Sequence, residues 1–109
     1  MTNNRVEVFT DSNFDADVLK SKLPVLVEFG AEWCGSCRIL EPVIENVAID
    51  YAGTLRVGTS DVEANGETAT RYQIFGLPTL LVFRGGNVVA RVTGAVPRKT
   101  LDRLLAQLL

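Results

Sequence analysis

The sequence predicts a single α/β domain with a mixed central β-sheet flanked by helices. Short apolar segments typical of strands alternate along the chain with segments whose apolar residues recur at helical spacing. This alternation predicts parallel strands, because each intervening helix carries the chain back across the sheet. A Gly-Gly pair at residues 85–86 lies between two strand-like segments and predicts a hairpin with an antiparallel edge strand. We expect residues 1–109 to form this one domain.

The first part of the chain contains two predicted strands with a short helix between them. Residues 6–9 are a strand candidate, and residues 10–13 (Thr-Asp-Ser-Asn) offer N-caps for the helix. Pro24 interrupts the chain before the second strand. Residues 25–29 (Val-Leu-Val-Glu-Phe) are apolar except for Glu28, which is the pattern of a central strand covered on both faces.

A long helix is predicted for residues 34–52, followed by Gly53 as a stop signal. Its apolar stripe consists of Ile39, Leu40, Val43, Ile44, Val47 and Tyr51. The remaining elements are a strand at 55–61, a short helix at 67–72, strands at 79–83 and 87–93, and a final helix from about residue 97. The predicted order is therefore β-α-β-α-β-α-β-β-α.

Residues 33–37 (Trp-Cys-Gly-Ser-Cys) contain the only two cysteines of the sequence. If Cys34 lies at the start of the long helix, it shares a helix face with Cys37, with the Cβ atoms about 5–6 Å apart. Disulfides form at roughly 4.4–6.8 Å between Cα atoms, so this pair can open and close with little backbone movement. The helix N-terminus also favours negative charge and should stabilise a thiolate on Cys34. These features predict a reversible dithiol/disulfide rather than a permanent structural bridge.

The composition excludes several other kinds of site. Without histidine there can be no Cys-His pair, no Ser-His-Asp triad and no Cys₂His₂ zinc site. Two cysteines also cannot supply the roughly four ligands of a structural zinc site within one chain. A net charge of −2 argues against a nucleic-acid or membrane partner, and no apolar segment has the length of a membrane span. Residues 1–7 lack the apolar region of a signal peptide, so we expect a cytoplasmic protein.

The sequence resembles the thioredoxin family along nearly its whole length. Residues 31–38 (Ala-Glu-Trp-Cys-Gly-Ser-Cys-Arg) contain a C-x-x-C motif in the β-α-β context that is typical of thioredoxin-like redox proteins. Pro42 follows in the helix, residues 76–79 (Gly-Leu-Pro-Thr) come at the family's distance, and the glycines at 85–86 and Gly94 come after them. The resemblance implies a thioredoxin fold and a protein-disulfide reductase that requires no cofactor.

The resemblance also implies roles for the residues of the site. Cys34 would be the exposed nucleophile, Cys37 the buried cysteine that resolves the mixed disulfide, and Glu28 the general base for Cys37. Pro78 would be a cis-proline whose loop pairs with the substrate backbone. The substrate-binding surface would consist of Trp33, Gly35, Ser36, Gly76, Leu77, Pro78 and Thr79. The partners would be disulfide-containing proteins and a thioredoxin reductase that uses NADPH or ferredoxin, and we expect a monomer.

Four positions depart from the commonest thioredoxin pattern. Ser36 stands where proline is usual, and Glu28 stands where aspartate is usual. Gly30 replaces a frequent aromatic residue, and Thr59 replaces a lysine that usually lies near the acid. Without that lysine, burial should raise the pKa of Glu28 toward neutrality. A hydroxyl group at Ser36 can donate to a thiolate, which would stabilise the reduced form and raise the redox potential.

Three other functions are compatible with the sequence. A raised potential would favour a more oxidising disulfide oxidase or isomerase, which an oxidative-refolding assay would detect. A non-enzymatic thioredoxin-fold subunit would act by binding alone, and a double Cys-to-Ser variant would then retain full function. Two chains could also share a metal through two cysteines from each, which would give a cluster absorption band.

Overall fold

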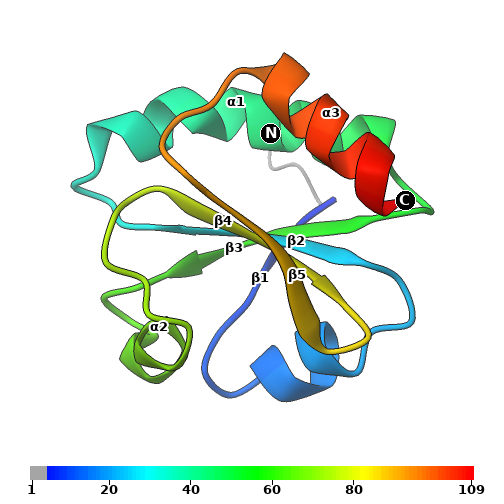
Figure 1. Cartoon of the computed structure of the whole chain (residues 1–109). Coiled ribbons are helices and arrows are strands. Elements are labelled where there is room, and N and C mark those ends of the chain that lie inside the picture. The colour runs from blue at the N-terminus through cyan, green and yellow to red at the C-terminus, as the bar shows by residue number, and fades with distance from the viewer. Residues whose placement is uncertain (1–4) are drawn as a thin grey trace.

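The structure is a computed structural model that describes residues 5–109. Five strands form one mixed sheet in the order β1-β3-β2-β4-β5 (Figure 1). The strands are β1 (Val6–Val8), β2 (Val25–Gly30), β3 (Arg56–Asp61), β4 (Thr79–Arg84) and β5 (Asn87–Thr93). Residues 1–4, which belong to the segment on which the signal-peptide expectation rests, lie outside the described residues.

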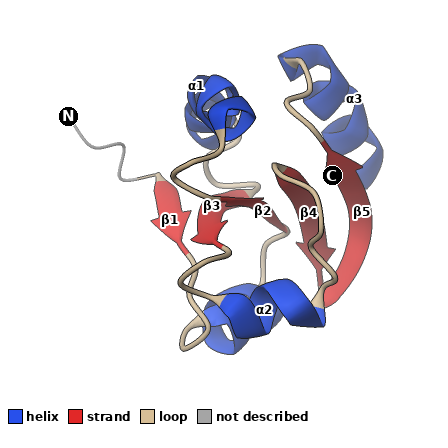
Figure 2. Ribbon diagram, turned by 90° about the vertical axis from the view of Figure 1, so that its left-hand side faces the viewer, coloured by secondary structure: helices blue, strands red, loops and turns tan. Residues whose placement is uncertain are grey.

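Helices cover both faces of the sheet (Figure 2). On one face lie α1 (Gly35–Asp50) and α3 (Arg98–Leu108), and on the other lie α2 (Gly66–Arg71) and η1 (Asp15–Leu19), a short π-helical turn. None of these described helices combines the length and apolar character needed to cross a membrane. The α/β fold class, the mixed central sheet and the element order predicted from the sequence are confirmed.

The antiparallel part of the sheet is larger than the sequence predicted. The Gly-Gly hairpin accounts for the antiparallel pairing of β4 with β5, but β4 is also antiparallel to β2. The two parallel ladders join β3 to β1 and to β2. Hydrophobic periodicity identifies strands without specifying which of them become neighbours, so this pairing was not predictable from the pattern.

The central strand β2 is buried along its whole length and divides the core into two clusters. Leu26 belongs to the cluster under α1 and α3, whereas Val27 and Phe29 pack on the other face with Phe14, next to η1. Successive side chains of a strand point to opposite faces, so Glu28 lies on the same face as Leu26. The strand therefore brings a carboxyl group under α1, the helix that begins at the cysteine motif.

The long helix is shorter than predicted, by one residue at its start and by two at its end. α1 begins at Gly35 with Cys34 as its N-cap, and it ends at Asp50 with Tyr51 as its C-cap. The chain then turns through Gly53, whose φ of +91° lies in the region that favours glycine. Placing Cys34 at the N-cap rather than inside the helix has a direct consequence for its sulfur atom.

Candidate active site

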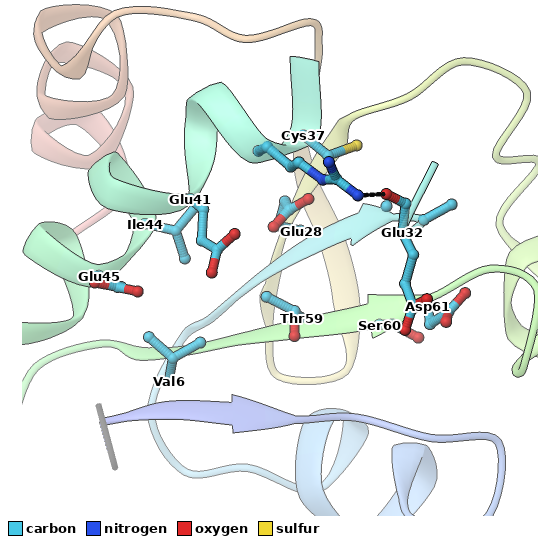
Figure 3. A pocket seen from close by; sticks show the side chains of 13 residues that line it. Val6, Glu28, Glu32, Cys37, Glu41, Ile44, Glu45, Thr59, Ser60 and Asp61 are labelled. Atoms are coloured by element: carbon cyan, nitrogen blue, oxygen red, sulfur yellow. Dashed lines mark hydrogen bonds between the residues drawn. The ribbon is translucent and has the colours of Figure 1, made fainter. Parts of the chain in front are cut away.

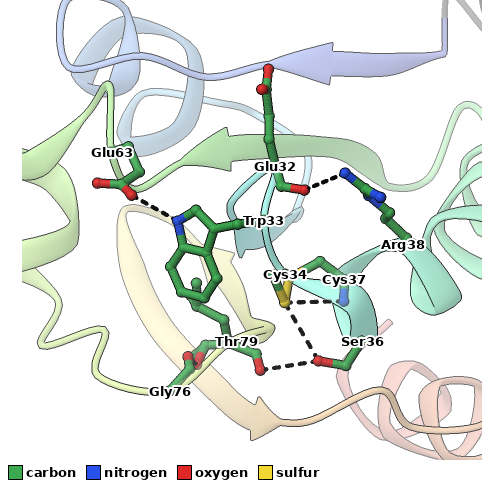
Figure 4. The surroundings of a disulfide bond; sticks show 10 residues. Glu32, Trp33, Cys34, Ser36, Cys37, Arg38, Glu63, Gly76 and Thr79 are labelled. Atoms are coloured by element: carbon green, nitrogen blue, oxygen red, sulfur yellow. Dashed lines mark hydrogen bonds between the residues drawn. A yellow bond between two sulfur atoms is a disulfide. The ribbon is translucent and has the colours of Figure 1, made fainter.

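The disulfide bond between Cys34 and Cys37 lies at the N-terminus of α1, with the two Cα atoms 5.3 Å apart (Figure 4). The backbone of Cys34 is extended, and its Sγ atom accepts a hydrogen bond from the Cys37 backbone N–H at 3.2 Å. This N–H group is one of the donors that a helix leaves unpaired at its first turn. In the reduced protein, a thiolate on Cys34 would face the same donor and the positive end of the helix dipole.

Both cysteines are buried in this oxidised structure. Cys34 is 5% exposed and Cys37 is 8% exposed, so the expectation of an exposed Cys34 beside a buried Cys37 is wrong here. The disulfide bond directs the Cys34 sulfur toward Cys37 and the hydroxyl group of Ser36 rather than outward. The two cysteines differ instead in their surroundings, because Cys34 caps the helix whereas Cys37 faces a pocket.

Glu28 is only 6% exposed, as the pattern of a covered central strand predicted, and the structure places it under α1. It is paired with Thr59 on β3 and with Leu80 on β4, neither of which carries a charge. The pKa of Glu28 is raised from 4.5 to about 7, chiefly by burial and to a smaller extent by the nearby carboxylate of Glu41. A carboxyl group with this pKa can exchange a proton near neutral pH, where a general base is most effective.

A pocket of about 640 Å³ joins Glu28 to Cys37 (Figure 3). Both residues line it, together with Gly30 on β2 and Glu41 on α1. Figure 3 shows the Glu28 carboxylate between the strand and the helix, below Cys37. The carboxyl group is therefore removed from bulk water but has open space beside it for proton exchange.

The hydroxyl group of Ser36 connects the cysteine motif to the proline loop. Its oxygen lies 3.4 Å from the Cys34 sulfur and 3.4 Å from the carbonyl oxygen of Leu77. The disulfide sulfur carries no proton, so the hydroxyl donates to one of these two acceptors. A thiolate on Cys34 would be a stronger acceptor than either, because hydrogen bonds to charged groups are the stronger ones.

The Leu77–Pro78 peptide bond is cis, as the resemblance implies. Pro78 is buried, whereas Gly76 before it is exposed. The hydroxyl group of Thr79 donates to the Gly76 carbonyl, and the Pro78 carbonyl accepts from the backbone N–H of Gly94. These bonds fix the loop beside the disulfide, where Figure 4 shows Gly76 and Thr79 across from the cysteine motif.

The other side of the disulfide carries an exposed indole ring. Trp33 is 69% exposed, and its Nε1 atom donates to a carboxylate oxygen of Glu63 at 2.7 Å (Figure 4). The ring is therefore held in one orientation although it lies on the surface. Gly35 is also exposed. Figure 4 shows four of the residues predicted to bind substrate around the disulfide: Trp33, Ser36, Gly76 and Thr79.

Sequence reasoning missed three residues that belong to these surroundings. Phe75 is 91% exposed and directly precedes Gly76. Only its position next to the predicted loop could have indicated that it belongs to the site. Glu63 is distant in sequence from Trp33, so no local pattern predicts their hydrogen bond. Glu41 follows Cys37 by one helical turn, and this spacing could have placed it on the same helix face.

Within residues 5–109, no group of three or more His, Cys, Asp or Glu side chains is arranged to hold a metal ion. Among the described residues, the site places two sulfur atoms next to one buried carboxyl group, that of Glu28.

Comparison with known proteins gives consistent matches over almost the entire chain. The thioredoxin family model matches residues 5–107. Thioredoxin 1 of Nostoc sp. is 45% identical over 96 residues, which cover 88% of this chain and 90% of that protein. The thioredoxin of Pseudomonas aeruginosa is 44% identical over 96 residues, with 88% and 89% covered. The chloroplastic thioredoxin M4 of Arabidopsis thaliana is 40% identical over 100 residues, covering 92% of this chain and 52% of that protein.

Proposed function

The chain belongs to the thioredoxin family, and we propose that Cys34, Cys37 and Glu28 carry out its chemistry. It is a thiol–disulfide oxidoreductase that acts as a protein-disulfide reductase. The observation that carries the assignment of roles is the different surroundings of the two sulfur atoms. Cys34 caps a helix N-terminus, and Cys37 lines the same pocket as a buried carboxyl group with a raised pKa.

In the first step, the thiolate of Cys34 attacks one sulfur atom of a substrate disulfide. A new sulfur–sulfur bond joins Cys34 to the substrate, the substrate disulfide breaks, and its other sulfur leaves as a thiolate that takes a proton from water. The backbone N–H of Cys37 and the helix N-terminus stabilise the attacking anion.

In the second step, Glu28 takes the proton of the Cys37 thiol, directly or through a water molecule in the pocket. The Cys37 thiolate then attacks the sulfur of Cys34, forming the internal disulfide and breaking the bond to the substrate. The second substrate sulfur leaves as a thiolate and is protonated. Two electrons have passed from the protein dithiol to the substrate disulfide.

As a family member, the protein acts on disulfide-containing proteins and receives electrons from a thioredoxin reductase. We propose that this reductase uses NADPH or ferredoxin, that the protein works as a cytoplasmic monomer, and that residues 1–109 form one functional domain. The docking surface comprises Trp33, Gly35, Ser36 and the loop from Gly76 to Thr79. The exposed ring of Phe75 extends this surface by one residue.

A paired assay tests the proposed direction of the reaction. Reduction of insulin disulfides, followed by turbidity, should be fast relative to the oxidative refolding of a reduced protein. The double Cys34→Ser/Cys37→Ser variant should lose the insulin activity, because no sulfur remains to accept the substrate. Faster refolding than reduction would indicate an oxidase or isomerase, and a fully functional double variant would indicate a binding protein.

The contact between Ser36 and Cys34 is the specific observation that favours a more oxidising protein. Replacing Ser36 with proline should lower the redox potential, because the reduced form loses a hydrogen bond to its thiolate. A hydrogen bond to a charged group contributes about 1.5–3 kcal/mol, and about 30 mV corresponds to 1.4 kcal/mol, so we expect a decrease of about 30–60 mV. Equilibration with a glutathione redox buffer measures it. An unchanged or higher potential in Ser36→Pro would remove the tuning role of this serine.

A further inference from the structure

Gly30 ends β2 on the same face as Glu28, and the space where its side chain would lie is already taken. A Cβ atom added to Gly30 would lie 2.7 Å from Oε2 of Glu28, closer than real Cβ atoms approach other heavy atoms. The same Cβ atom would lie 3.1 Å from the sulfur of Cys37. The carboxylate and the sulfur therefore converge on one point, which is free only because residue 30 is glycine.

Nothing else in the described part of the chain holds the carboxylate in this position. Among residues 5–109, Glu28 has neither a hydrogen bond nor an ion pair, and the charged group that shifts its pKa is the repulsive carboxylate of Glu41. The pocket of about 640 Å³ beside Glu28 offers room for its carboxylate to turn away from Cys37. The free space over Gly30 therefore determines whether the carboxyl group of Glu28 faces the sulfur atom of Cys37.

The backbone conformation at position 30 does not require a glycine. Its φ does not lie in the left-handed region, and its carbonyl oxygen accepts an ordinary hydrogen bond from the backbone N–H of Val62 at 3.0 Å. An alanine could adopt the same backbone, so the effect of a methyl group would fall on the neighbouring side chains. The closest of these is the end of a flexible glutamate, which can move without disturbing the sheet.

We propose that Gly30 is a positioning residue for the resolving step, because its missing side chain lets the longer acid at position 28 reach Cys37. This inference rests on the proposed role of Glu28 as the base for Cys37. Glutamate at 28 and glycine at 30 then form a matched pair, in which the carboxylate of the longer acid lies in the space left by the missing side chain.

Gly30→Ala should slow the resolving step without affecting the attack by Cys34. A positioned proton acceptor contributes typically ~10²–10⁴-fold, so displacing it should slow resolution by about tenfold or more. Glu28→Asp shortens the acid by one methylene group and withdraws it from the added methyl group. The Glu28→Asp/Gly30→Ala double variant should therefore resolve faster than Gly30→Ala alone, which a general loss of structure would not produce.

Stopped-flow reaction of the reduced protein with dithiobis-nitrobenzoate separates the two steps. Attack by Cys34 releases one coloured thiolate, and resolution by Cys37 releases the second. Gly30→Ala should retain the rate of the first phase within about twofold and slow the second phase by about tenfold or more, up to the ~10²–10⁴-fold that a positioned base contributes. Gly66→Ala is the matched control, because a Cβ atom there meets no atom within 4 Å, and both of its phases should equal those of the wild type.

Glu28→Gln distinguishes failure of this inference from failure of the proposed base. A normal second phase in Glu28→Gln would show that Glu28 is not the base. A slow second phase in Glu28→Gln with a normal one in Gly30→Ala would overturn only the role of Gly30. If Gly30→Ala does not fold, Glu28→Asp is compared with the double variant. Equal second phases support the inference, and a slower double variant contradicts it.

Discussion

Replacing Glu28 with glutamine is expected to stabilise the oxidised protein at pH 8 relative to the wild type. The pKa of Glu28 is raised from 4.5 to about 7 in the folded protein, chiefly by burial. As the pH rises, the unfolded chain therefore loses this proton before the folded protein does. The stability that the protonated group contributes to the fold is present below pH 4.5 and is lost as the pH rises through 7. Such a shift changes the free energy of unfolding by roughly 3 kcal/mol over the whole range of pH in which the group titrates. About 2–3 kcal/mol of this change falls between pH 5 and pH 8.

Chemical denaturation of both proteins at pH 5 and pH 8 measures this effect. The free energy of unfolding of Glu28→Gln, relative to the wild type, should increase by about 2–3 kcal/mol between the two pH values. Glu41→Gln is a useful control, because it removes only the smaller cause of the shift and should leave most of the pH dependence in place. A difference between Glu28→Gln and wild type that does not change with pH would mean that Glu28 is not a buried, proton-binding acid.

Replacing Cys37 with serine is expected to stop turnover and leave the protein covalently attached to its substrate. Cys34 still has the helix N-terminus and the Cys37 backbone N–H, which serine retains, so the first step should proceed. The second step has no attacking sulfur, and the mixed disulfide should accumulate. The physical reason is that an oxygen atom cannot form the internal disulfide.

Non-reducing electrophoresis with insulin as substrate measures this outcome. Cys37→Ser should form a stable mixed disulfide with insulin, which a thiol reagent cleaves. Its rate of insulin reduction should fall below detection. Cys34→Ser is the matched control, which should give neither adduct nor activity. An adduct formed by Cys34→Ser but not by Cys37→Ser would reverse the roles of the two cysteines.

The strands and the cysteine motif were predictable because they depend on local sequence. The apolar segment at residues 25–29 had the pattern of a covered central strand, and the C-x-x-C motif at a helix start indicated a reversible disulfide. The structure places Glu28 under α1, as the strand alternation required. The antiparallel pairing of β4 with β2 was missed, because strand neighbours are determined by packing of the whole chain.

The finer features of the site depend on space between side chains, which a sequence pattern does not contain. Gly30 was noted only as a departure from the family pattern, and the point where Glu28 and Cys37 converge became visible only in the structure. The burial of Cys34 was likewise unpredictable, because it follows from the direction of the disulfide bond. Phe75 directly precedes a predicted loop, but its exposure depends on how the folded chain positions that loop.

Alkylation of the reduced protein distinguishes Cys34 as the nucleophile from Cys37 as the resolving cysteine. The protein is treated with limiting iodoacetamide at pH 7, and the label on each cysteine is quantified by peptide mass spectrometry over time. Cys34 should be labelled first, because its thiolate is stabilised at the N-cap of α1, and Cys37 should follow much more slowly. Equal labelling rates, or faster labelling of Cys37, would contradict it.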